Sequence, residues 1–246
     1  MSVDTARRPS NRSVRSTASW LLWMNLYLAA WFWGIAIVVA VGALAVINQV
    51  GDVNNSVLAF ARQGAIWFPF SVLIAITAAY LPVLVAAGLT RRSLALGSLV
   101  SATGMALVYG AVYTGLLLVE RAVFDALGWR WRFLESLSPE NADSLTLFVS
   151  STMLLLTAYV SGVLVAICYQ RVGGWWGTLA LPFTAGPILL VSALFSEDAG
   201  PFSTSAWFGG DKPLLLASAA TLLITAVMAF AFDRLTRGAS VPSRTS

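Results

Sequence analysis

The chain alternates between long uncharged apolar runs and short segments that carry the charges and turn residues. A hydrocarbon core about 30 Å thick requires roughly 20 apolar helical residues per crossing, so each long run predicts a transmembrane helix. Six runs qualify: residues 21–47, 65–89, 96–119, 144–168, 177–195 and 213–232. They are unlike the roughly ten-residue alternating strands of a transmembrane barrel. The pattern therefore predicts an all-α polytopic membrane protein with six transmembrane helices.

Composition agrees with this pattern and removes several classes of function. Of the 246 residues, 58% are hydrophobic and 11% are charged, whereas an ordinary soluble domain has about 25% charged residues. There is no His and a single Cys, so the usual transition-metal sites, Cys/His nucleophile pairs and disulfides are excluded. No phosphate-binding loop or other catalytic motif is present, so we expect no catalytic residue, metal or cofactor in this chain.

The charges predict an orientation in the membrane. With a cytoplasmic N-terminus, the basic residues on the inside are Arg7, Arg8, Arg12, Arg15, Arg91, Arg92, Arg171, Arg234, Arg237 and Arg244. The remaining five of the fifteen lie outside, so the positive-inside rule places both termini in the cytoplasm of a cell-membrane protein. The orientation in the membrane then explains the excess of basic over acidic residues, so we do not expect nucleic-acid binding.

This orientation divides the chain into three parts. Residues 1–20 form a basic cytoplasmic tail with the start of an interfacial helix, 21–233 form the transmembrane domain, and 234–246 form a disordered cytoplasmic tail. The first run is longer than one crossing requires. Either the stretch around Arg12, Arg15, Trp20 and Trp23 lies along the interface, or the run is one tilted helix. A cleaved secretory signal fits less well, because its apolar region is typically 7–15 residues long.

Features inside the runs predict packing and a class of mechanism. Prolines predict kinks in the second and fifth runs, at Pro69, Pro82, Pro182 and Pro187. The steps Gly97–Ser101 and Ala111–Gly115 in the third run predict close helix packing. None of the six runs contains Asp, Glu, Lys or Arg, which argues against an ion-coupled carrier.

Two short cytoplasmic turns separate the predicted helices. Residues 88–94 read Gly-Leu-Thr-Arg-Arg-Ser-Leu, in which Thr90 can cap a helix that continues through Arg91, Arg92 and Ser93. The second turn follows residue 168 and contains Tyr169, Gln170 and Arg171. Such turns can contact a cytoplasmic partner, or their arginines can simply set topology and touch lipid phosphates. The outer connection 120–143 is apolar enough to predict a short re-entrant or interfacial helix.

The segment 80–94, Tyr-Leu-Pro-Val-Leu-Val-Ala-Ala-Gly-Leu-Thr-Arg-Arg-Ser-Leu, resembles the small six-helix permeases of actinobacterial ABC-2-type (ABCG-like, type V) exporters. In that family a Gly-hydrophobic-Ser/Thr-Arg-Arg turn joins the same two helices. The turn Tyr169-Gln170-Arg171 looks like the second cytoplasmic turn of the family. One departure is Ala86-Ala87, where the family would have bulkier residues.

The resemblance implies a permease subunit that pairs with a second permease subunit, as a homodimer or heterodimer, and docks separately encoded ABC ATPase subunits. Those partners would carry the ATP and magnesium. The implied coupling turn consists of Gly88, Leu89, Thr90, Arg91, Arg92, Ser93 and Leu94. The implied connecting helix runs from Arg12 to Trp23 along the interface.

These features lead to a transport hypothesis. ATP-driven closure of the partner would push on the 90–93 turn and open a cavity lined by the first, second and fifth helices. Uncharged walls predict an amphipathic or hydrophobic cargo, such as a peptide, lipid or drug, that moves outward. The alternative is a non-transporting membrane scaffold or accessory subunit of another complex, and co-purification with an ATPase would discriminate between the two.

Overall fold

The computed structural model describes residues 11–50, 56–86, 90–129, 131, 143–195 and 214–237, with only the backbone described at 11–17, 50, 81–82 and 84–86. The secondary structure in this part of the chain is helical, which confirms the all-α prediction. The helices are α1 (Asn11–Val50), α2 (Leu58–Ala86), α3 (Arg91–Leu127), α4 (Ser144–Leu179), α5 (Leu181–Thr184), α6 (Gly186–Phe195) and α7 (Leu214–Arg237).

Five helical stretches are long and apolar enough to cross a membrane, and they match five of the six predicted runs. These stretches are Ala18–Gln49, Leu58–Tyr80, Arg91–Leu127, Ser144–Leu179 and Leu214–Arg237. Most of the helices extend beyond the predicted runs. Helix α7, for example, continues to Arg237 through the first residues of the predicted C-terminal tail.

The fifth predicted run is a broken path and not one helix. Just before this run the chain leaves helical geometry at Gly173, with φ of 80° and ψ of 179°. The run itself is interrupted twice, first at Ala180 and then at Ala185. Pro182 and Pro187 lack the amide hydrogen that an unbroken helix needs. At the second interruption the hydroxyl of Ser161 on α4 donates to the carbonyl of Thr184 at 2.5 Å. A neighbouring helix thus supplies a hydrogen bond at the break, as a buried backbone group in a membrane requires.

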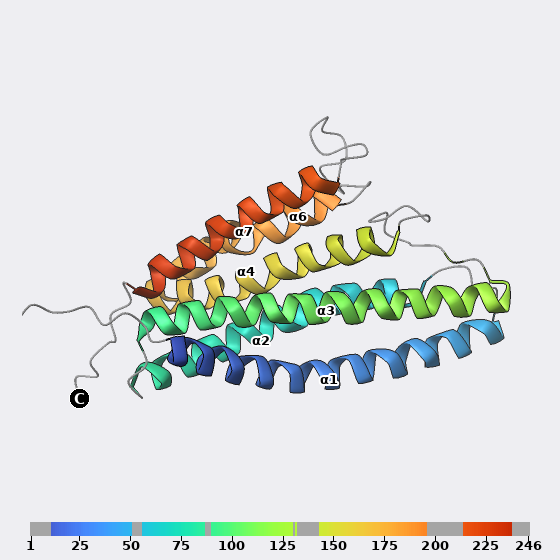
Figure 1. Ribbon diagram of the computed structural model, residues 1–246, viewed down its shortest axis with the longest axis horizontal. Coiled ribbons are helices and arrows are strands. Elements are labelled where there is room, and N and C mark those ends of the chain that lie inside the picture. Colours follow the sequence, from blue (N-terminus) through green and yellow to red (C-terminus); the bar gives the residue numbers. More distant parts are fainter. Residues whose placement is uncertain are drawn as a thin grey trace, which may run out of the picture.

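Helix α4 is the centre of the bundle. Figure 1 shows α1 on one side, α2 and α3 next to it, α4 in the middle and α6 with α7 on the far side. Of the most apolar 18 residues of α4, 83% are buried, against 11% in α1. The outer surface of α1 is apolar, as expected for a helix that faces lipid.

Glycines allow α2 and α3 to approach α4 closely. A Cβ atom on Gly162 would lie 2.8 Å from the carbonyl oxygen of Phe70 on α2, and one on Gly110 would overlap the Thr152 hydroxyl. Neither of these contacts was predicted. Of the two predicted small-residue steps, Gly97–Ser101 is buried, whereas Ala111 and Gly115 are exposed, so the second step packs no helix of the described chain.

Aromatic rings join α1, α3 and α4 in the middle of the bundle. Trp33 lies 5.5 Å from Tyr109 and 6.2 Å from Tyr113 between ring centroids, and Tyr109 lies 5.7 Å from Tyr159. All four rings are at most 5% exposed. Trp31, in contrast, is 61% exposed on the outer surface of α1.

Side-chain caps explain where two helices begin. The Thr90 hydroxyl accepts the Ser93 amide at 3.2 Å at the start of α3, which confirms the predicted cap. The Asp143 carboxylate accepts the Thr146 amide at 3.0 Å at the start of α4. Hydrogen bonds from Thr146 lower the pKa of Asp143. Helix α3 ends at Gly128, whose φ of 70° favours glycine.

Candidate functional site at the basic end of the bundle

The predicted functional segments gather at one end of the bundle, where α1 and α3 begin and α2 and α7 end (Figure 1). We call this the basic end, because it carries Arg91, Arg92, Arg171, Arg234 and Arg237. Arg237 forms an ion pair with Asp233 at 2.7 Å, and Arg234 lies over the ring of Phe230. The excess of positive charge suits an acidic partner surface or lipid phosphates.

The implied coupling turn divides into an accessible part and an anchored part. Arg92 is exposed and Arg91 is half-buried, whereas Ser93 and Leu94 are buried. The Ser93 hydroxyl donates to the Thr90 carbonyl at 2.8 Å. Ser93 and Leu94 therefore anchor the turn to the bundle, and their side chains do not face a partner. Gly88 and Leu89 lie outside the described residues.

The second predicted turn lies farther along the chain than expected. Tyr169, Gln170 and Arg171 are helical residues of α4, and the reversal occurs at Gly173, where positive φ favours glycine. The Tyr169 hydroxyl is 2.9 Å from that of Thr178, and a Cβ on Gly177 would lie 2.9 Å from the Tyr169 ring. Gly177 therefore lets the part of α4 after Gly173 pack closely against the part before it.

Gln170 connects α4 to α2 at a weak point of α2. Its Nε2 donates to the carbonyl of Ala78 at 2.9 Å, with a longer contact of 3.4 Å to the carbonyl of Thr77. In an unbroken helix the Ala78 carbonyl would accept the amide of residue 82. Residue 82 is proline and has no amide hydrogen. The Gln170 side chain therefore supplies the hydrogen bond that Pro82 removes.

We expect Gln170→Leu to lower the free energy of unfolding by about 1 kcal/mol, because it leaves the Ala78 carbonyl without this donor. Pro82→Ala restores a backbone amide for that carbonyl. The loss caused by Gln170→Leu should therefore shrink toward zero in the Pro82→Ala background. Unfolding of the four proteins in mixed micelles measures this cycle, and equal losses in both backgrounds would contradict the pairing.

The predicted interfacial helix is continuous with the first span. Helix α1 runs from Asn11 to Val50 without interruption, so the backbone supports the alternative of one long helix. No glycine or proline lies between Asn11 and Trp33 to break it. Trp20 packs edge-on against Tyr80 of α2 at 5.1 Å, while Trp23 is 75% exposed. Arg12 and Arg15 lie in the first turns of α1, where only the backbone is described.

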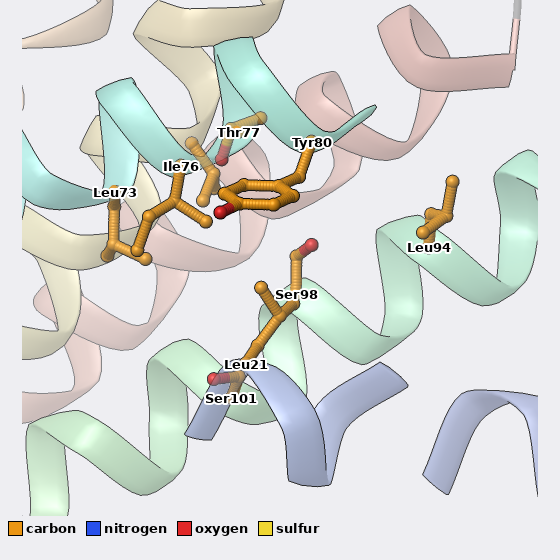
Figure 2. Close-up of a pocket in the computed structure, with 9 residues that line it drawn as sticks. Leu21, Leu73, Ile76, Thr77, Tyr80, Leu94, Ser98 and Ser101 are labelled. Carbon is orange, nitrogen blue, oxygen red and sulfur yellow. The ribbon is translucent and has the colours of Figure 1, made fainter. Parts of the chain in front are cut away.

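A small cavity lies next to the Trp20–Tyr80 contact, between α1, α2, α3 and α4. Figure 2 shows Tyr80 and Thr77 on one side and Ser98 and Ser101 on the other. Its volume is about 20 Å³, which is enough for a single water molecule. A cavity of this size cannot hold an amphipathic cargo.

The predicted cargo cavity is not formed by the described part of a single chain. Helix α6 packs against α4 and α7, whereas α1 packs against α3 and α2, on the opposite side of the bundle (Figure 1). The first, second and fifth spans therefore do not enclose a common space. The sequence could not show this, because the order of helices along the chain does not determine which faces meet.

A second polar cluster at the opposite end of the bundle was also missed. Glu120 on α3 is only 5% exposed, and its carboxylate accepts the amides of Val57 and Leu58 at 2.9 and 3.0 Å. It also accepts the Ser56 hydroxyl and, at 3.2 Å, the indole N–H of Trp131. Glu120 therefore caps the N-terminus of α2 from another helix. The sequence places Glu120 just outside a span, but nothing in it indicates a partner more than 60 residues away.

Within the described residues, no three His, Cys, Asp or Glu side chains gather where they could hold a metal ion. Comparisons with protein-family models, curated proteins and solved structures found no match to this chain. The fold defines its class: a helical bundle with several apolar helices long enough to span a membrane, as expected of a membrane-embedded protein.

Proposed function

We propose that this chain is the transmembrane permease subunit of an ATP-driven ABC-2-type exporter. One observation carries the proposal. The last turns of α2, the beginning of α3, the Gln170 region of α4 and the beginning of α1 lie together at the basic end of the bundle (Figure 1). A partner that binds there would contact four spanning helices at once.

The α2–α3 turn is the proposed docking site for the ATPase subunit. Arg92 is exposed and Arg91 is half-buried, and in the described part of the chain neither has an ion-pair partner. Their charges are therefore available to acidic side chains of a partner. Ser93 and Leu94 hold the turn against the bundle, so a force on the arginines would be transmitted to α3.

Two contacts would carry movement of this turn to the other helices. Gln170 links the end of α2 to α4 through the Ala78 carbonyl, and the Trp20–Tyr80 contact links α2 to α1. A push on the turn would then tilt α1 to α4 together. Because the first, second and fifth spans do not enclose a common space in the described part of one chain, a cargo cavity lined by them would require two permease subunits.

The docking proposal predicts that changing Arg91 and Arg92 to Glu lowers the ATPase activity recovered with the tagged chain by about tenfold, equivalent to about 1.4 kcal/mol of binding. The chain is purified from its native membranes, and both ATP hydrolysis and the ATP-binding subunit are assayed. Asp125→Arg, an exposed position on α3 at the opposite end, also reverses a charge and is the matched control, which should leave recovery unchanged.

Two outcomes would contradict the proposal. Full recovery of an ATPase with the Arg91/Arg92 variant would remove the turn from the interface. Stable isolation of the wild-type chain with another membrane protein and no ATP-binding subunit would favour the scaffold alternative.

A further inference from the structure

An apolar groove runs between α1 and α3 at the end of the bundle opposite to the basic end. Its volume is about 330 Å³. One wall is a stripe of α1 from Ile37 to Asn48 at helical spacing, and the other is the last three turns of α3, from Leu116 to Leu127. Among the described residues that line it, the polar side chains are Asn48, Glu120 and the indole of Trp129.

The groove crosses the expected boundary of the hydrocarbon layer. Glu120 and Arg121 are adjacent charged residues on α3, and charged side chains are expensive in the hydrocarbon core, so they mark its edge. Leu116 lies on the membrane side of this edge, and Leu127 lies two turns beyond it. At this end α1 and α3 project past α4 and α7 (Figure 1). The apolar walls therefore continue outside the hydrocarbon layer.

Water is a poor occupant of this groove. A bound water needs two to four polar partners, and the walls provide almost none. The carboxylate of Glu120 is already engaged by Ser56, by two backbone amides of α2 and by Trp131. Apolar walls that extend beyond the bilayer need an apolar occupant to exclude water.

The size of the groove restricts the occupant further. The groove is larger than an apolar cavity of about 150 Å³ that holds benzene, so it has room for a substantial part of a hydrocarbon chain. Its lining runs along α1 from Ile37 to Asn48, and a single flexible hydrocarbon chain matches this length and the apolar surface.

We infer that this groove binds one acyl chain of a membrane phospholipid. The chain end lies between Ile37 and Leu116, and the head group lies beside Asn48 and Trp129, raised above the level of the surrounding lipids. The amphipathic indole of Trp129 suits that position. The site does not depend on ATPase docking, so it can be tested with the permease chain alone.

The test uses the purified full chain in phosphatidylcholine vesicles that contain a few per cent of a phospholipid with a diazirine on its acyl chain. After illumination, mass spectrometry of peptides locates the labels. We expect them to concentrate on the groove walls of α1 and α3. Ala45→Trp, which fills the groove, should lower this labelling at least fivefold. Val46→Trp, at the next position but outside the groove and 62% exposed, should leave it within twofold.

Labelling spread over all lipid-facing surfaces in proportion to exposure would overturn the proposal, as would labelling that Ala45→Trp leaves unchanged. Ala45→Cys in a Cys168→Ala background distinguishes a second copy in the groove. A disulfide between two chains without labelling of the groove would assign it to that copy and reject the lipid. Thermal unfolding in detergent verifies that the two Trp variants are folded.

Discussion

Gly162→Leu is expected to destabilise the bundle by more than about 3 kcal/mol, and the variant should be recovered mainly as aggregate. Even the first carbon added at this position would lie 2.8 Å from the carbonyl oxygen of Phe70 and 3.3 Å from the Leu73 Cβ. The obstacle is backbone of α2, which cannot rotate away as a side chain can. Helices α2 and α4 would have to separate along the centre of the bundle. Thermal unfolding in detergent and the monodisperse fraction after purification measure the effect.

Gly115→Leu is the matched control for this prediction. Gly115 also lies within a spanning helix, but nothing lies within 4 Å of a Cβ added there. The control should be as stable as the wild type or slightly more stable, because leucine is a better helix former than glycine. If both variants unfolded at the wild-type temperature, the close approach of α2 and α4 would be refuted.

Glu120→Ala should lower the free energy of unfolding by about 3 to 5 kcal/mol. The substitution leaves the amides of Val57 and Leu58 and the indole of Trp131 without their acceptor. A buried donor that loses its acceptor costs about 1–3 kcal/mol, and the half-buried donors of Val57 and Trp131 cost less than the buried amide of Leu58. The loss should be accompanied by faster hydrogen exchange at the first amides of α2, which native-state exchange can resolve. Exchange that remains slow at Val57 and Leu58 would show that another group caps α2.

Two further variants separate the hydrogen bonds from the negative charge of Glu120. Glu120→Gln retains one acceptor oxygen, but its amide nitrogen is a donor that faces another donor, so an intermediate loss is expected. Asp125→Ala removes an exposed carboxylate about one turn farther along α3 and should have an effect below about 0.5 kcal/mol. A large effect of Asp125→Ala would indicate that net charge at this end, and not the cap, determines stability.

Hydropathy alone predicted much of the fold, because a bilayer imposes a minimum length of apolar helix at each crossing. Five runs became helices that satisfy this requirement, and Thr90 became the predicted cap of α3. The run 177–195 did not become one helix. Its prolines were visible in the sequence, but the hydrogen bond from Ser161 to Thr184 at the break comes from another helix.

The residues of the candidate site were only partly predictable. Arg92 is exposed, as a docking role requires, but Ser93 and Leu94 in the same segment are buried by neighbouring helices. Gln170 was expected in a turn and is instead a helical residue that bonds to α2. The sequence could not show the pairing of Gln170 with Ala78, because no local pattern relates positions 92 residues apart.

The amino-acid sequence by itself determined the helical class, the number of apolar runs and the asymmetric placement of the basic residues. These properties follow from the solvation of the backbone and of charges in lipid, which each segment experiences separately. Only the tertiary structure decided that α4 is central, that Glu120 caps α2 and that α1 and α3 form a groove between them. Those features depend on which faces of distant helices meet, and the van der Waals packing and hydrogen bonds that select the faces exist only after the helices assemble.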